Sequence, residues 1–186
     1  MEWFLISGLL LMLSVLAIWV VMLRSERGRL ESLLLTDELT GVLSRRGLLF
    51  SFSNLSAQKT DQTEIQVVFV DMNGLKALNS EGGHLAGDKA LRTLGQRLRE
   101  FCEPNEWVAR YGGDEFVLFL RTSSGVTVDR LERLNESLDR SQQFTWAHAM
   151  LDRKGDLLKQ INDLSRQVLN KKLDIDSQRI FDRLDF

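Results

Sequence analysis

A mostly apolar run with β-branched residues, Ile65 to Met72 (IQVVFVDM), constrains the fold more than any other segment. The run is apolar on both alternating faces, as in a central strand. The chain after it predicts, in order, a helix over 85–101, strands over 106–112 and 115–120, a helix over 128–140 and a strand over 143–151. This order is the split βαβ arrangement of a ferredoxin-like sheet. We therefore expect an α+β (α/β) fold with a βαββαβ core and helices packed on one face of the sheet.

Two further helices are expected, one from about Ser44 through RRGLLFSFSNL and one over 155–172, while the tail after Leu173 is ambiguous. In the ferredoxin-like topology, the end of the first strand lies beside the hairpin that joins the next two strands. Asp71 should therefore face the acids of that hairpin, Asp114 and Glu115, across neighbouring strands.

The first 23 residues contain a long apolar segment, Trp3 to Leu23, that has no charged side chain. As a helix its 21 residues would span roughly 30 Å of hydrocarbon. A cleaved signal peptide is the alternative, but the segment follows the acidic Glu2 and no small-residue cleavage site succeeds it. We predict one transmembrane helix over residues 1–23.

Three arginines directly follow this segment, at positions 24, 27 and 29. The positive-inside rule then predicts a single-pass protein of the inner (cytoplasmic) membrane, with the domain at 37–186 in the cytoplasm. Residues 24–36 form a juxtamembrane connector. Leu23, Leu30 and Leu34 could line one side of a helix along which two helices pair. Alternatively, Leu33, Leu34 and Leu35 could cover the domain behind, and both readings remain open.

Composition excludes several classes of ligand. The net charge of −2 provides no basic surface for polymeric DNA or RNA. One cysteine cannot form an internal disulfide, and the two histidines have no neighbours at zinc-ligand spacing. We expect neither nucleic-acid binding nor a zinc site.

The acids Asp71, Asp114 and Glu115 would repel one another unless a cation lies among them. Carboxylate and carbonyl oxygens suit Mg²⁺, with Mn²⁺ as the alternative. Gly112 and Gly113 lack a Cβ and would let a ligand approach the hairpin backbone. The alternative is a solvated turn whose glycines and acids satisfy local geometry alone.

The stretch VDMNGLKALNSEGGHLAGDKAL places Lys76, Asn79 and Asp88 at fixed offsets after Asp71. We expect a glycine-containing loop here, whose amides and lysine would bind phosphates. Asn79 and Asp88 together can recognise the ring edge of guanine, whose N1–H and amine are donors. Taken one at a time, Lys76 could be a surface charge, Asn79 a turn former and Asp88 a helix-start residue.

Three motifs in this order resemble those of the GGDEF family of diguanylate cyclases. They are DELTGVLSRRG (37–47), DMNGLKALNSEGGHLAGD (71–88) and RYGGDEF (110–116). The resemblance implies a palm-like domain, and a homodimer in which each subunit holds one GTP and the two are condensed into cyclic di-GMP with release of pyrophosphate.

The resemblance also implies roles for individual residues. Asp71, the Met72 carbonyl and Asp114 would hold Mg²⁺, and Glu115 would complete the acidic centre. Lys76 would contact the triphosphate, and Asn79 and Asp88 would hold guanine. Asp114, Glu115 and Lys76 are thus the expected catalytic residues.

Some positions depart from the family pattern. Asn73, Leu75, Ser44 and Ser80 replace residues around the expected site, which should tune the site and not abolish it. No register of the last helix places Lys, Gly and Arg together, so either Lys171 or Lys172 substitutes for the family's cation or phosphate binding is weaker. The inhibitory R-x-x-D site falls on EPNE (103–106), which lacks the arginine, so we expect no product feedback there.

An alternative function is a catalytically inactive GGDEF-like domain that binds GTP or a partner protein and signals by contact. The altered C-terminal helix favours it, and the intact acids argue against it. A third reading is a structural membrane protein whose turn acids are incidental. The sequence contains no sensory domain of its own, so a regulatory membrane or cytoplasmic protein is the expected partner in signalling.

Overall fold

The computed structural model describes residues 12–24, 35–57, 64–121 and 124–184. Residues 12–24 form a helix whose large apolar side chains are exposed. Among the described residues, no helix combines the length and the apolar character needed to cross a membrane. Residues 1–11 of the expected membrane span and 25–34 of the connector lie outside the described part of the chain.

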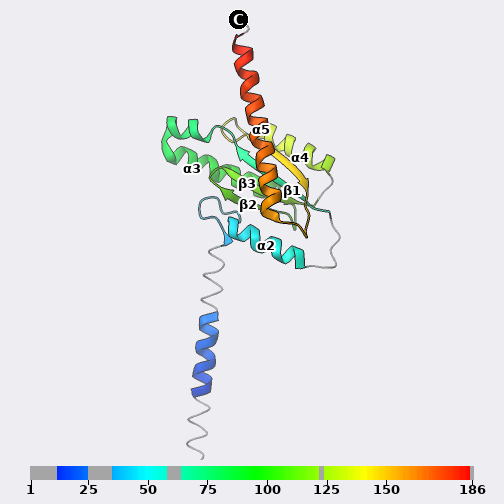
Figure 1. Ribbon diagram of the computed structural model, residues 1–186. Coiled ribbons are helices and arrows are strands. Elements are labelled where there is room, and N and C mark those ends of the chain that lie inside the picture. Colours follow the sequence, from blue (N-terminus) through cyan, green and yellow to red (C-terminus); the bar gives the residue numbers. More distant parts are fainter. Residues whose placement is uncertain (1–11, 25–34, 58–63, 122–123, 185–186) are drawn as a thin grey trace, which may run out of the picture.

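Four antiparallel strands form the sheet: β1 (Gln66–Met72), β2 (Trp107–Gly112), β3 (Glu115–Leu120) and β4 (Phe144–Met150). Their order in the sheet is β2-β3-β1-β4, and β1 pairs with both β3 and β4 (Figure 1). The central place of β1 follows from its composition, since its side chains are buried on both faces. The expected order of strands and helices along the chain and the α+β class are confirmed.

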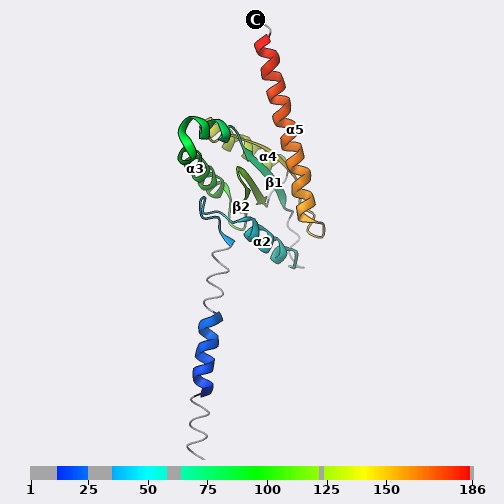
Figure 2. The ribbon, with the colours of Figure 1, turned by 60° about the vertical axis from the view of Figure 1, so that its left-hand side comes forward.

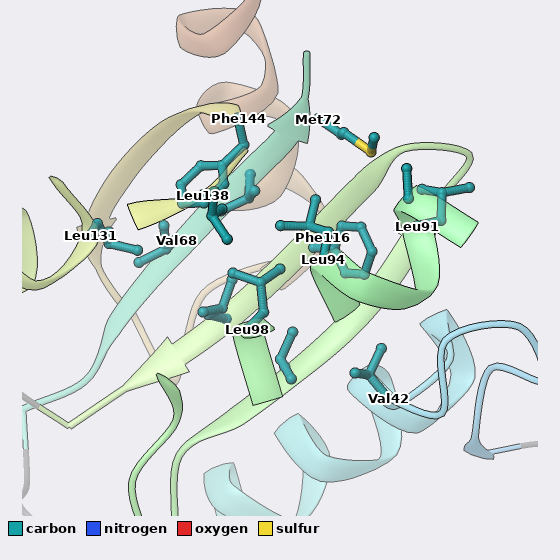
Figure 3. Close-up of a cluster of buried hydrophobic side chains, with 14 of the residues drawn as sticks. Val42, Val68, Met72, Leu91, Leu94, Leu98, Phe116, Leu131, Leu138 and Phe144 are labelled. Carbon is teal, nitrogen blue, oxygen red and sulfur yellow. The ribbon is translucent and has the colours of Figure 1, made fainter. Parts of the chain in front are cut away.

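The two helices of the βαββαβ core lie on one face of the sheet, as expected, and the two other helices of the domain cover the opposite face (Figure 2). On one face, α3 (Leu75–Phe101) and α4 (Ser124–Ser137) pack against alternate residues of β1 and β3, including Val68 and Phe116 (Figure 3). On the other, α2 (Arg45–Ala57) and α5 (Leu157–Leu184) cover residues such as Val67 and Phe119. A strand apolar on both faces needs cover on both, because exposed apolar area destabilises the fold.

Two helices are longer than the sequence pattern indicated. α3 already begins at Leu75, so the expected glycine-containing loop is a short turn followed by helix, with a kink at Gly83 (φ 72°). Gly74, at φ 73°, adopts the left-handed conformation just before α3, which glycine allows at little cost. α5 continues past Lys172 and extends beyond the sheet (Figure 1).

Candidate functional site

The acidic residues meet where β1 ends beside the β2–β3 hairpin. Asp71 is the partner of Glu115 in the antiparallel ladder of β1 and β3. The Met72 amide donates a hydrogen bond to the Asp114 carbonyl at 3.0 Å, which fixes the end of β1 against the turn. The expected juxtaposition of Asp71 with the hairpin acids is therefore confirmed.

Crowding of these acids changes how they hold protons. Burial raises the pKa of Asp71; Lys172 opposes this rise, and the charge of Asp114 adds to it. Burial also raises the pKa of Glu115, and the charges of Asp71 and Asp114 raise it further. Two half-buried carboxylates with raised pKa values form a centre that favours a nearby positive charge.

The donor set fits Mg²⁺ by its chemistry, since it offers carboxylates from Asp71, Asp114 and Glu115 beside the Met72 carbonyl. These groups would hold the metal only together with oxygen atoms of a substrate. In the described ranges, no three acidic, His or Cys side chains are grouped closely enough to hold a metal by themselves. Mg²⁺ commonly binds through one or two carboxylates together with substrate phosphates, so the set suits a metal that arrives with a nucleotide.

A lysine of α5 reaches this centre. Lys172 Nζ donates to the Asp71 carboxylate and, at 3.3 Å, to the Met72 carbonyl. Lys171 points elsewhere, donating to the Trp146 carbonyl at 2.9 Å and lying over the Trp146 ring. Of the two lysines that could replace the family's C-terminal cation, Lys172 is thus the one placed at the site.

A cavity of about 450 Å³ adjoins the acids and is lined by Leu75, Lys76, Asn79, Ser80, His84 and Asp114. Although Asn79 lines this cavity, its Oδ1 atom is itself buried, and it has no hydrogen-bond partner among the described residues. Gly87 makes room for this amide, because a Cβ at Gly87 would lie 2.0 Å from Asn79 Oδ1. A buried, unsatisfied acceptor is costly unless a ligand donor completes it.

Of the other residues predicted to bind substrate, some lie at this cavity or at the hairpin turn and one lies outside the cavity lining. Lys76 is exposed and lines the same cavity, whereas Asp88 lies outside the cavity lining and is 3.9 Å from Arg92. Space around a Cβ built on Gly113 is open, so a ligand can approach the turn there. Gly112 instead faces the Glu115 carboxylate, because a Cβ at this position would lie 3.2 Å from Glu115 Oε2.

Sequence reasoning gave no role to Arg110 or Asp37, although both lie in quoted motifs. Arg110 donates to the Gly113 carbonyl from Nε (3.0 Å) and Nη2 (2.7 Å), and its Nη1 lies 3.2 Å from Asp37 Oδ1. Burial alone would raise the pKa of Asp37, but hydrogen bonds from Thr40 and the charge of Arg110 lower it below its ordinary value. Arg110 thus ties the turn that carries Asp114 to the start of the domain. The available signal was an arginine placed directly before the Tyr-Gly-Gly turn.

A four-stranded antiparallel sheet with acids at the end of β1 and in the adjoining hairpin defines the class of the domain as α+β. The protein-family model described as "Diguanylate cyclase, GGDEF domain" matches residues 34–163. The chain therefore belongs to the GGDEF family.

Similar proteins include the diguanylate cyclase DgcP of Pseudomonas aeruginosa, 35% identical over 106 residues, which are 56% of this chain and 16% of that protein. DgcP of Escherichia coli is 30% identical over 121 residues, covering 64% of this chain and 36% of the relative. The chain thus spans well under half the length of these curated relatives.

Solved structures agree on the fold. A microbial GGDEF domain studied with cyclic di-GMP superposes with a TM-score of 0.65 at 26% identity, covering 76% of this chain and 94% of that chain. The coiled coil and GGDEF domain of Caulobacter crescentus DgcB, solved with cyclic di-GMP, gives a TM-score of 0.72 over 86% and 92% of the two chains. At 19% identity, the latter likeness concerns the fold alone.

Proposed function

We propose that the protein is a diguanylate cyclase that condenses two GTP molecules into cyclic di-GMP and releases pyrophosphate. The observation that carries the proposal is the Asn79 cavity, a pocket with an unpartnered amide oxygen bounded by Asp114 of the acidic centre. Guanine offers N–H donors to that oxygen, and the phosphates of the same GTP would extend towards the acids. Family membership supports the same activity.

In the reaction, the ribose 3′-oxygen of one GTP forms a bond to the α-phosphorus of the other, and the bond from that phosphorus to the pyrophosphate oxygen breaks. Asp71, the Met72 carbonyl and Asp114 would hold Mg²⁺, or Mn²⁺ in its place, with Glu115 completing the set. When bound, the metal neutralises charge on the phosphates and lowers the pKa of the attacking hydroxyl.

The chain's own residues position the substrate. Asn79 accepts hydrogen bonds from guanine, and Asp88 would complete that recognition after α3 adjusts. Lys76, at the cavity wall, contributes a point charge to the triphosphate. Arg110 holds the turn of Asp114 in register by its bonds to Gly113.

Ring closure needs two half-sites, so the active form is proposed to be a homodimer. We further propose that the chain is anchored in the inner (cytoplasmic) membrane with the GGDEF domain in the cytoplasm. The uncharged run at 3–23 and the exposed apolar side chains of the helix at 12–24 support this placement. Control would then come from a regulatory membrane or cytoplasmic protein.

The test is to incubate the purified full-length chain with GTP and Mg²⁺ and to quantify cyclic di-GMP and pyrophosphate. We expect both products from the wild type. Asp114→Asn and Glu115→Gln should reduce turnover at least about a hundredfold while circular dichroism stays unchanged. Full activity in both variants would refute the assignment of the acids.

A further inference from the structure

A second cavity, of about 720 Å³, adjoins the turn that follows β1. Gly74 lines this cavity and the next residue, Leu75, lines the Asn79 cavity, so the turn between β1 and α3 contributes to both linings. Lys172, which lines the second cavity, also bonds to Asp71 and the Met72 carbonyl. The described lining residues of the second cavity are Asn73, Gly74, Arg140, Gln143, Thr145, Lys172 and Ile175.

The second cavity is cationic. Arg140 and Lys172 are its charged residues, and no carboxylate belongs to the lining that the structure describes. Lys172 is shared with Asp71, but Arg140 is exposed and makes no ion pair with any described residue. A planar guanidinium that is free of carboxylates matches the bidentate geometry of a phosphate group.

Hydrogen bonds hold the walls of the second cavity in place. The Asn73 amide donates to the Gln143 carbonyl at 2.8 Å, and Thr145 Oγ1 donates to Asn73 Oδ1 at 2.9 Å. Arg140 lies in a turn closed by the Gln142 amide and the Asp139 carbonyl, 2.8 Å apart. The segment that carries Arg140 is therefore tied to the turn that separates the two cavities.

We propose that Arg140 is a substrate-binding residue that contacts the terminal phosphates of GTP from the α4–β4 turn, with Lys172 of α5 lining the same cavity. A nucleoside triphosphate needs a polar base pocket and a cationic phosphate pocket, and the two cavities lined by successive residues of the β1–α3 turn provide both. The inference rests on the proposed function for the identity of the nucleotide. Arg140 lies outside the three motifs that carry the resemblance, and it supplies an arginine to the cavity, where Lys172 is the cation that α5 contributes.

The test compares the affinities of the full-length chain for GMP and for guanosine α,β-methylene triphosphate, whose carbon bridge prevents release of pyrophosphate. Titration calorimetry in Mg²⁺ gives both Kd values for the wild type, Arg140→Ala and the matched control Arg133→Ala, an exposed arginine on α4. We expect Arg140→Ala to raise the Kd for the triphosphate analogue about tenfold, equivalent to about 1.4 kcal/mol. The Kd for GMP should stay within about twofold of the wild-type value. Arg140→Lys should recover part of the loss, and Arg133→Ala should change neither affinity.

Unchanged binding of the analogue by Arg140→Ala would overturn the inference, as would an equal loss of GMP affinity. The proposed function is judged separately by product formation. If the wild type produces cyclic di-GMP but Arg140→Ala binds the analogue as tightly as the wild type does, the inference is refuted and the proposed function stands. Arg140-dependent binding of the analogue by a chain that forms no product supports the inference and refutes the cyclase activity.

Discussion

Glu106 and Arg130 form a buried ion pair, and the decrease in the free energy of unfolding that follows from breaking it can be predicted quantitatively. The Glu106 side chain is 1% exposed and that of Arg130 is 14% exposed. Glu106 Oε1 accepts from the Arg121 amide (2.9 Å) and Arg130 Nη1 (3.1 Å), and Oε2 accepts from the Glu103 amide (2.8 Å) and Arg130 Nη2 (3.0 Å). The perturbation is Glu106→Gln, which keeps the size of the side chain and removes its charge.

The expected loss follows from these contacts. The substituted side chain would turn an amide N–H₂ towards donors that the carboxylate now satisfies, and Arg130 would remain largely buried without its counter-charge. Breaking a buried pair in this way costs about 3–5 kcal/mol, and the partial exposure of Arg130 places the expected loss at about 3 kcal/mol. Glu103→Gln is the matched control, because Glu103 is 69% exposed and lies 3.5 Å from Arg130. It should cost less than about 1 kcal/mol.

Urea unfolding followed by tryptophan fluorescence measures both losses. With a slope of about 2 kcal/mol per molar urea, Glu106→Gln should lower the midpoint by about 1.5 M. A midpoint within about 0.3 M of the wild type would refute the reasoning, since it corresponds to less than about 0.6 kcal/mol.

The same pair predicts a dependence on pH. Burial alone would raise the pKa of Glu106, but the hydrogen bonds from Arg130 and from two backbone amides lower it overall. A carboxylate with a lowered folded-state pKa contributes stability that is present above its unfolded pKa and is lost as pH falls through the folded value. The gap in stability between wild type and Glu106→Gln should therefore be full at neutral pH and narrow under acid conditions, below the ordinary carboxyl range.

Three further outcomes follow. Gly87→Ala should raise the KM for GTP about tenfold, because its Cβ would displace the Asn79 amide. The control Gly125→Ala, which has open space around its Cβ, should leave the KM unchanged. Equal KM values for the two variants would count against the guanine pocket. Arg110→Met should lower kcat about tenfold or more by releasing the Gly113 turn, with circular dichroism unchanged, and a wild-type kcat would remove its positioning role. Cyclic di-GMP should not inhibit initial rates through residues 103–106, because the Glu106 carboxylate is already saturated by internal bonds; potent inhibition that Glu103→Gln relieves would contradict this.

The strands were predictable because their signals are local. Alternation and β-branching located the run ending at Met72, and the Gly-Gly turn located the hairpin, so topology alone brought Asp71 to Glu115. The start of α3 at Leu75 was missed, since glycines at 74 and 83 resemble loop signals while one caps and the other only kinks the helix.

The remaining features depend on contacts between distant parts of the chain. Lys172 reaches Asp71 across 101 positions, and Arg110 reaches Asp37 across 73. No periodicity encodes such pairs, because each depends on where the complete fold places two side chains. Cover of the sheet on both faces follows from the same packing, in which α2 and α5 come from opposite ends of the domain.

The most direct test of the account measures cyclic di-GMP made from GTP and Mg²⁺ by the full-length chain over a range of protein concentrations. The account predicts two pyrophosphates for each cyclic di-GMP, and a specific activity that rises with concentration until the dimer is complete. Folded protein that binds GTP and forms no cyclic di-GMP at any concentration would contradict the account.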